Sequence, residues 1–421
     1  MAEHTSATDA DRVSSSWFQL EQEARTTKEH CLVGVDGVMY YASVLSGASS
    51  AQDRPSFLFS LKHVDLVNKV TTDLYDDPIY PGQDSLFVYD MGCQALDEQS
   101  FAFFIHMNCV DGAEGSCVTI GRHDVISGAH VRGTYEFDAE VSQQKGTHDL
   151  TVLDGTPHVF YSDNSRKEIK ALALRNGSVA PVEPFNQFEV ADLRDIIWGG
   201  RPRVVASGGT AYMAFNSSVN RFLLTRRDLA DLDQPATREI YLAESADGVE
   251  WSNVRLLELE GYDAEEADFS FLAADPQGHL HMVWGDHGQI LGGFAPSTTS
   301  SPDALYYARS LDQGATWSVP RSVPKPQDAY YTFPVALAVS PRGTAVFVFE
   351  SLLTQRPGAN VYYATWAPEA EEHVARLDRS GLDASAFMDE QGTLHLVAYY
   401  APANPPEGEG VQLRYHVIEI D

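Results

Sequence analysis

The sequence repeats a pattern in which an apolar stretch leads into a turn that begins with Asp or Ser. The position six residues before that turn residue is polar or charged in four copies, and chargeable side chains stand beside it in two more. Such side chains can transfer a proton, act as a nucleophile or hold a carboxylate. The residues predicted to be catalytic are therefore His30, His148, Arg201, Asp268, Tyr331 and Asp383.

A second group of residues suits ligand binding. Long polar segments follow the second apolar stretch in copies four to seven, and segments of this length in a compact fold often bind ligands. Several of these residues are cationic in an otherwise acidic chain, and one carboxylate stands beside a histidine. Ordinary surface solvation is the alternative explanation. The residues predicted to bind substrate are Arg221, Arg226, Asp286 and His287, together with Arg203, which stands beside Arg201 in the first strand of the fourth copy and would hold a carboxylate or hydroxyls.

The elements that would position these residues are short strands. Most copies read as strand, Gly-containing turn and aromatic-rich strand, and a third strand follows in residues 239–245, 304–310, 360–366 and 412–418. The turns recur about every 50 to 70 residues, the size of a propeller blade with long loops. The chain is therefore predicted to be all-β, a single β-propeller over residues 1–421 with four-stranded antiparallel blades. Seven blades are favoured because seven copies are found, and six is the alternative because the second copy is weak.

Two conclusions follow from the propeller prediction. The last copy ends at its third strand, so the N-terminal segment 12–24 is predicted to supply the missing outer strand and close the ring. Propeller geometry also brings the starts of the innermost strands together beside the axis. The candidate catalytic residues would then surround one polar funnel. A channel that is simply wet and polar is the alternative.

Two third strands run into a sharper motif, Ser310-Leu-Asp312-Gln-Gly314-Ala-Thr316-Trp317 and the shorter Ser245-Ala-Asp247-Gly248-Val-Glu-Trp251. It resembles the Asp-box, or BNR repeat, of the sialidase-like propeller superfamily. The resemblance implies that Asp247 and Asp312 are structural and lie on the face opposite the active site. The Arg-Ile-Pro segment typical of sialidases is absent, so no catalytic residue is carried over from them.

Composition limits the class of partner. The net charge is −31 and the sequence pI is about 4.6, which argues against binding nucleic acid or an anionic membrane. No apolar run is long enough to span a bilayer, and no signal peptide is recognisable, so a cytoplasmic location is expected unless a signal was removed.

The cysteines bear on redox state and metals. Cys31, Cys93, Cys109 and Cys117 form no metal-type CxxC, and neither a metal nor another cofactor is expected. Reduced thiols are expected, with a Cys109–Cys117 bridge across a hairpin as the alternative.

Three classes of function fit these features. The first is glycoside hydrolysis by paired carboxylates, or by Tyr with a carboxylate, on a small-molecule or glycan ligand that can be anionic. The second is a polysaccharide lyase in which His30 or His148 abstracts a proton, Tyr331 protonates the leaving oxygen and Arg201 neutralises a uronate. The third is a propeller that binds a glycan, peptide or protein without catalysis, or that serves in a biosynthetic pathway. The hydrolase is the favoured function.

Overall fold

The structure is a computed structural model. It describes residues 15–21, 27–46, 57–80, 88–108, 116–137, 148–163, 168–182, 200–218, 238–257, 259–260, 262, 267–286, 304–323, 329–353, 359–367, 373–379, 384–400 and 412–420. For some residues at strand ends only the backbone is described. Within these ranges every regular element is a β-strand.

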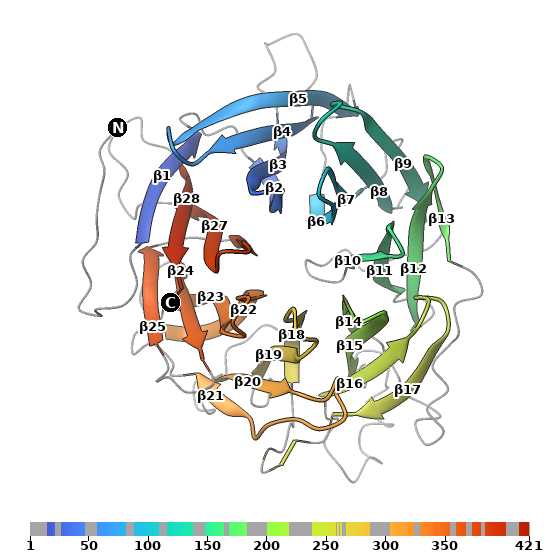
Figure 1. The fold of residues 1–421 in the computed structure, drawn as a ribbon, viewed down its shortest axis with the longest axis vertical. Helices are drawn as coiled ribbons and strands as arrows, with labels where there is room; N and C mark the ends of the chain where they lie inside the picture. The colour runs from blue at the N-terminus through green and yellow to red at the C-terminus, as the bar shows by residue number, and fades with distance from the viewer. Residues whose placement is uncertain are drawn as a thin grey trace, which may run out of the picture.

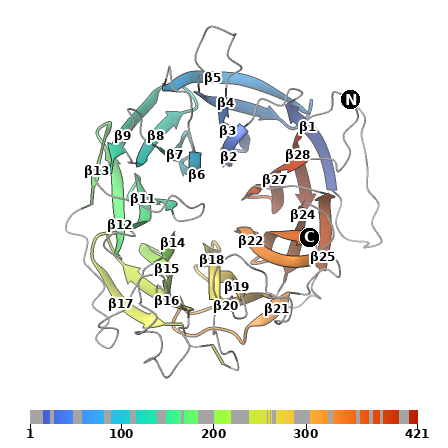
Figure 2. The same ribbon diagram turned by 180° about the vertical axis from the view of Figure 1, so that it is seen from behind.

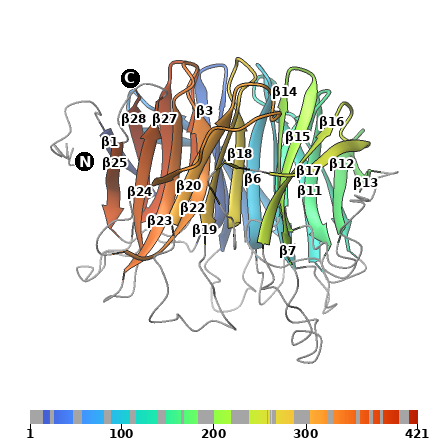
Figure 3. The ribbon, with the colours of Figure 1, turned by 90° about the horizontal axis from the view of Figure 1, so that it is seen from below.

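Twenty-eight strands form seven antiparallel sheets of four, which surround a common axis (Figures 1 and 2). Seen from the side, the strands run between the two faces of the ring (Figure 3). The prediction of an all-β propeller with seven blades is confirmed.

The blades are numbered here in chain order, each from its innermost strand outward. Blade 1 contains β2 (Thr27–Val35), β3 (Val38–Ser46), β4 (Phe57–Asp65) and β5 (Val70–Tyr80). Blade 2 contains β6 (Val88–Asp97), β7 (Ser100–Asn108), β8 (Ser116–Asp124) and β9 (His130–Glu136). Blade 3 contains β10 (His148–Leu153), β11 (Thr156–Asp163), β12 (Glu168–Arg175) and β13 (Ser178–Pro181). Blade 4 contains β14 (Gly200–Ser207), β15 (Thr210–Ser218), β16 (Arg238–Ser245) and β17 (Trp251–Leu256).

The remaining blades follow the same plan. Blade 5 contains β18 (Ala267–Ala274), β19 (Leu280–Asp286), β20 (Ala304–Ser310) and β21 (Arg321–Val323). Blade 6 contains β22 (Ala329–Val339), β23 (Ala345–Leu353), β24 (Ala359–Trp366) and β25 (His373–Arg379). Blade 7 contains β26 (Ala384–Met388), β27 (Thr393–Tyr400), β28 (Gln412–Glu419) and β1 (Ser15–Glu21).

The core lies between neighbouring blades. Alternate residues of a strand point to opposite faces of its sheet, so each sheet buries both faces against its neighbours. Between blades 1 and 2, for example, the ring of Phe59 stacks on that of Phe103 with centroids 4.4 Å apart, and both side chains are buried. Such contacts explain why the inner strands carry long apolar runs, and they hold the polar residues of those strands in fixed positions.

Blade 7 is built from both ends of the described chain. Strand β1 pairs antiparallel with β28, with Trp17 opposite His416 and Phe18 opposite Tyr415. Figure 1 shows β1, in blue, beside β28, in red. Leu20 of β1 is buried in the core that blades 7 and 1 share. The pairing joins the two ends of the ring through backbone hydrogen bonds.

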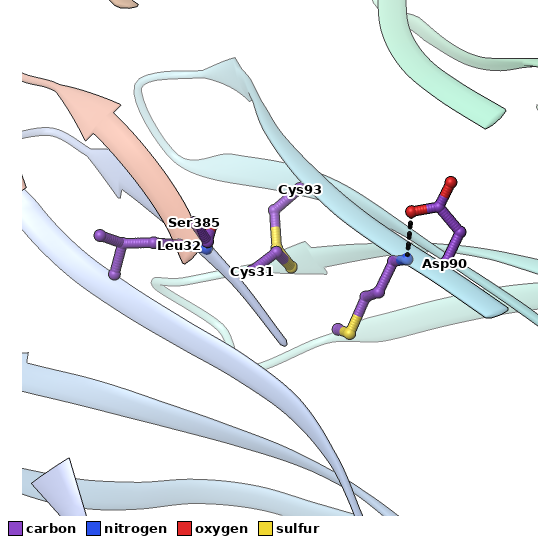
Figure 4. Close-up of a disulfide and its surroundings, with 6 residues drawn as sticks. Cys31, Leu32, Asp90, Cys93 and Ser385 are labelled. Carbon is purple, nitrogen blue, oxygen red and sulfur yellow. Dashed lines mark hydrogen bonds between the residues drawn. A yellow bond between two sulfur atoms is a disulfide. The ribbon is translucent and has the colours of Figure 1, made fainter. Parts of the chain in front are cut away.

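A disulfide joins the innermost strands of blades 1 and 2. Cys31 of β2 is bonded to Cys93 of β6, with 5.7 Å between their Cα atoms (Figure 4). Cys117 is disulfide-bonded as well, and its partner lies outside the described residues. The expectation of reduced thiols is therefore wrong. The physical reason is the ring itself, which places β2 beside β6 although the two cysteines are 62 residues apart in sequence.

We expect loss of this disulfide to destabilise the protein strongly. Replacing both Cys31 and Cys93 by Ala removes a crosslink that closes a long loop in the unfolded chain, which typically costs about 2–5 kcal/mol. Urea unfolding of the double variant and of the unmodified protein measures the difference. Thiol labelling of the unfolded, unreduced protein is the control, because labelled Cys31 and Cys93 would contradict the crosslink.

Candidate functional site

Polar and charged side chains gather on the inner strands of blades 2, 3 and 4. The starts of β6, β10 and β14 lie near the axis at the same face of the ring, because each innermost strand runs in the same direction (Figures 1 and 3). The candidate site consists of five residues from these strands and from β7. They are Asp90, His106, His148, Asp149 and Arg203.

An acid and a base form the centre of this site. Asp149 follows His148 at the start of β10, and its Oδ1 lies 3.8 Å from Nη1 of Arg203 on β14. Its Oδ2 accepts a hydrogen bond of 2.6 Å from the backbone N–H of Val204. The side chains of Asp149 and Arg203 remain 25% and 12% exposed. The carboxylate is thus held by the next blade without being cut off from solvent.

Two histidines lie against each other beside this pair. The rings of His106 on β7 and His148 on β10 have centroids 3.9 Å apart, and both side chains are buried. Asp90 of β6 stands directly opposite His106 in the strand register. Its carboxylate accepts hydrogen bonds from the backbone N–H of Met91 at 3.1 Å and of His148 at 3.4 Å. Asp90, His106 and His148 therefore form one cluster across blades 2 and 3.

The surroundings shift the proton affinities of these groups in opposite directions. Burial raises the pKa of Asp149 to about 6 and Asp90 adds to the rise, whereas Arg203 and the Val204 N–H act against it. Burial lowers the pKa of His106 to about 3. Burial, His106 and Arg203 hold the pKa of His148 well below its usual value. Near pH 6 the site therefore contains a carboxyl group that can give up a proton, next to two neutral imidazoles.

The predicted site residues fall into four groups in the structure. His148 and Arg203 belong to the cluster just described, and Arg203 lies in β14 between Asp149 and Ser270. His30 is buried in β2 of blade 1, with its ring centroid 5.9 Å from that of Tyr41. The backbones of the next four lie in described strands, and only their side chains are outside the description: Arg201 in β14, Asp268 in β18, Asp286 in β19 and Tyr331 in β22. Asp383, Arg221, Arg226 and His287 lie outside the described residues.

Three members of the cluster, Asp90, His106 and Asp149, are not among the residues that the sequence predicted to be catalytic or to bind substrate. Asp149 directly follows the repeat position that selected His148, so the repeat pointed at the right place and one residue short of the solvent-accessible group. His106 and Asp90 belong to the weakest copy of the repeat. Aligning that copy by its strand register, in which Asp90 pairs with His106, would have found them.

Asp247 and Asp312, which the sequence places in an Asp-box-like motif, lie at the turns between third and fourth strands, and their contacts are those of a structural turn. Asp247 Oδ1 accepts hydrogen bonds from the backbone N–H groups of Val249 and Glu250. Asp312 accepts from both the N–H and the hydroxyl of Thr316, and these bonds lower its pKa to about 2. Gly314, with φ of 86°, adopts the left-handed conformation that favours glycine.

We expect Asp312→Ala to lower stability by about 1 kcal/mol, because three hydrogen bonds at an exposed turn are lost. We expect no effect on ligand binding or catalysis, because the turn joins the two outer strands of blade 5, whereas the candidate site lies on the inner strands of blades 2–4. Thermal unfolding and an activity assay on the same preparation check this prediction. Loss of activity in a folded Asp312→Ala protein would contradict it.

In three blades a histidine stands three residues after the glycine of the turn between the first two strands, and in two of these blades it belongs to a buried hydrogen-bond network. In blade 5, Nδ1 of His281 lies 2.7 Å from the hydroxyl of Tyr307, and its Nε2 lies 3.6 Å from Asp275. In blade 7, His395 bridges Tyr415 and Asp389 in the same way. Because the arrangement repeats in two blades and is buried, it is explained by packing within the blades rather than by ligand binding.

Neither a metal cluster nor a membrane segment is found in the part of the chain that the structure describes. There, no group of three His, Cys, Asp or Glu side chains is arranged to hold a metal ion. In the same residues, no helix has the length and apolarity that crossing a bilayer requires.

Comparisons with known proteins place the chain only loosely. No family model matches it. No curated protein matches it either. Among solved structures, a protein of unknown function from Dyadobacter fermentans has a TM-score of 0.47 at 11% identity, and the match covers 98% of this chain and 100% of that one. An α-L-arabinanase from Penicillium chrysogenum in complex with arabinobiose has a TM-score of 0.45 at 11% identity, with coverages of 99% and 98%.

A third solved structure, an α-L-arabinofuranosidase from Fusarium graminearum, has a TM-score of 0.43 at 12% identity, with coverages of 94% and 96%. Values this low do not identify a relative. The class of the protein, a seven-bladed β-propeller, rests on its own strand pairing.

Proposed function

We propose that the protein is a carbohydrate-active enzyme of the glycoside hydrolase type, with its site on the inner strands of blades 2–4. The observation that carries this proposal is the partly exposed Asp149 carboxyl group, held beside Arg203 and the Val204 N–H, where burial raises its pKa to about 6. Glycosidases need a carboxylic acid that is still protonated near neutral pH, so that it can give its proton to the leaving oxygen. A carboxyl group with an ordinary pKa would already have lost that proton.

The second carboxylate of the proposed mechanism is Asp90. It lies on the neighbouring inner strand, close enough that its charge raises the pKa of Asp149. Two backbone N–H groups hold its oxygens in place. In this role Asp90, which is buried, would be either the nucleophile or the base that activates water.

His148 fits a supporting role better than the role of a base. Its pKa is far below neutral, so it would bind an abstracted proton only weakly, which disfavours a lyase that uses this residue. Its backbone does more in the site, since the N–H donates to Asp90 and the carbonyl oxygen accepts from Arg203. The residue thereby connects the two carboxylates through the start of β10.

The remaining candidates complete the proposal. Arg201, Asp268, Tyr331 and Asp383 would continue the polar ring through blades 4–7, and Arg221, Arg226, Asp286 and His287 would bind the ligand from segments beyond the second strands. We also propose that residues 1–421 act as one domain of the Asp-box superfamily, supported by the hydrogen bonds of Asp247 and Asp312.

We further propose that the protein matures in an oxidising compartment. The disulfide joins two blades, with Cys31 buried and Cys93 partly buried, and structural disulfides are rare in reducing cytoplasm. This favours the secreted alternative over the cytoplasmic one.

A screen of the purified protein tests the proposed function. It combines aryl glycosides of neutral and acidic sugars, a glycan array, and uronate polymers with an ultraviolet readout for unsaturated products. Turnover of a glycoside is the expected result. Unsaturated products would assign a lyase instead, and retention of a glycan without turnover would assign a binding propeller. The absence of turnover and of binding in every assay would also overturn the proposal.

A further inference from the structure

The guanidinium group of Arg203 connects three blades. Its Nη1 donates a hydrogen bond of 3.0 Å to the carbonyl oxygen of His148 in blade 3, and its Nε donates one of 3.3 Å to that of Ser270 in blade 5. The group also lies over the ring of Phe271, with 4.4 Å between Cζ and the ring centroid. These contacts fix the cation at one place although the side chain belongs to blade 4.

The fixed cation stands beside the proposed proton donor. Nη1 lies 3.8 Å from Oδ1 of Asp149, and the neighbouring residue Val204 donates its N–H to the other oxygen of the same carboxyl group. Blade 4 thus holds both oxygens of Asp149. The sequence suggested that Arg203 binds substrate. Because its Nε and Nη1 already donate to backbone carbonyl oxygens, the side chain is less suited to that role.

The ionisable groups around Asp149 come from four strands. Arg203 on β14 is the cation, and Asp90 on β6 is a second anion that acts in the opposite direction. His148 on β10 and His106 on β7 are the other ionisable groups nearby, and burial keeps both neutral near pH 6. Arg203 is therefore the charge that opposes both burial and Asp90 at this carboxyl group.

We propose that Arg203 is a positioning residue, which holds the Asp149 carboxyl group in place and keeps it able to release its proton in the working pH range. The inference rests on the proposed function, since it assigns a role to the same carboxyl group. Without the cation, Asp149 would stay protonated to higher pH, because burial and Asp90 would act unopposed. The Asp149 carboxyl group would then be protonated over a wider pH range, but it would be a weaker acid and would give its proton to the substrate less readily.

Titration of Asp149 in Arg203→Gln and Arg203→Lys tests the proposal without any substrate. Carboxyl ¹³C signals of labelled aspartate report the midpoint, and Asp149→Asn assigns the signal. We expect Arg203→Gln to raise the midpoint by about one to three pH units, the usual effect of a neighbouring opposite charge. We expect a smaller rise in Arg203→Lys, which keeps the charge but not the two-carbonyl geometry. If Arg203→Gln does not fold, the Arg203→Lys titration decides alone.

Arg255→Gln is the matched control. Arg255 also joins two blades, because its Nη2 donates to the carbonyl oxygen of Gly314 at 2.8 Å, and it pairs with Glu244 at 2.7 Å. A merely structural role of Arg203 would make the two variants alike, with lower stability and an unchanged midpoint of Asp149. An unchanged midpoint in folded Arg203 variants overturns the proposal.

The pH dependence of turnover separates this inference from the proposed function. With an active substrate, the alkaline limit of the rate should move upward in Arg203→Gln by the same amount as the midpoint. If the midpoint moves but no glycoside is ever turned over, the positioning role stands and the hydrolase proposal fails. If turnover depends on Asp149 but its alkaline limit does not move, the positioning role fails and the hydrolase proposal stands.

Discussion

Replacing Asp149 by Asn is expected to lower kcat by about 10²- to 10⁴-fold on glycosides with poor leaving groups, the usual contribution of a positioned general acid. The substitution keeps the size of the side chain and its acceptor for the Val204 N–H, but removes the titratable proton. Aryl glycosides with acidic phenols should lose much less, because their leaving oxygens hardly need protonation. Initial rates on matched substrates of both kinds measure the difference.

The pH profile gives this prediction a second readout. Only protonated Asp149 can donate, so the activity of the unmodified protein should fall as the pH rises through about 6. The residual activity of Asp149→Asn should lack that alkaline limit. Asp154→Asn is the matched control, because it makes the same change at the turn of the same hairpin, where φ is 48° and Asn is well tolerated. Equal losses in both variants would contradict the assignment.

The free energy of unfolding is expected to fall steeply as the pH drops below 6.5. Burial lowers the pKa of His106 and His416 to about 3 and that of His281 to about 4, and it holds that of His148 well below 6.5. These histidines stay neutral in the folded protein while the unfolded chain takes up their protons. Each contributes about 1.4 kcal/mol per pH unit between 6.5 and its folded pKa.

Asp149 acts in the opposite direction over part of this range. Its pKa is higher in the folded protein than in the unfolded chain, so its contribution to stability is present below pH 3.8 and is lost as the pH rises through about 6. Urea unfolding between pH 4.5 and 7 measures the net slope. In His416→Phe, which lies far from the candidate site in blade 7, the slope should decrease by the share of one histidine. An unchanged slope would mean that His416 is already charged in the folded protein.

The propeller could be predicted because each copy carries its own evidence. The turn residues Gly37, Gly155, Gly209, Gly278, Gly343 and Gly392 all have positive φ, which is what their position between two strands requires. Other turns are built alike but could not be recognised. Asp65 and Asp124 accept backbone hydrogen bonds as Asp247 does, yet neither is followed within two residues by Gly, and neither turn contains the Trp of the motif.

The candidate site was predicted only in outline, for a physical reason. Neighbouring residues of a strand point to opposite faces, and nothing in the sequence says which of His148 and Asp149 stays accessible to solvent. The structure shows His148 buried against His106 and Asp149 partly exposed beside Arg203. The Cys31–Cys93 bond depends in the same way on contacts between blades, which no single copy of the repeat reveals.

The pairing of β1 with β28 has a consequence for how the protein is made. Strand β1 leaves the ribosome before every other described strand, whereas its partner β28 leaves last. The first strand must therefore wait, with the apolar side chain of Leu20 uncovered, until the six intervening blades have been synthesised. Ring closure therefore cannot occur before β28 has been synthesised, and a chain that stops short of β28 would present an open strand edge that can pair with another copy.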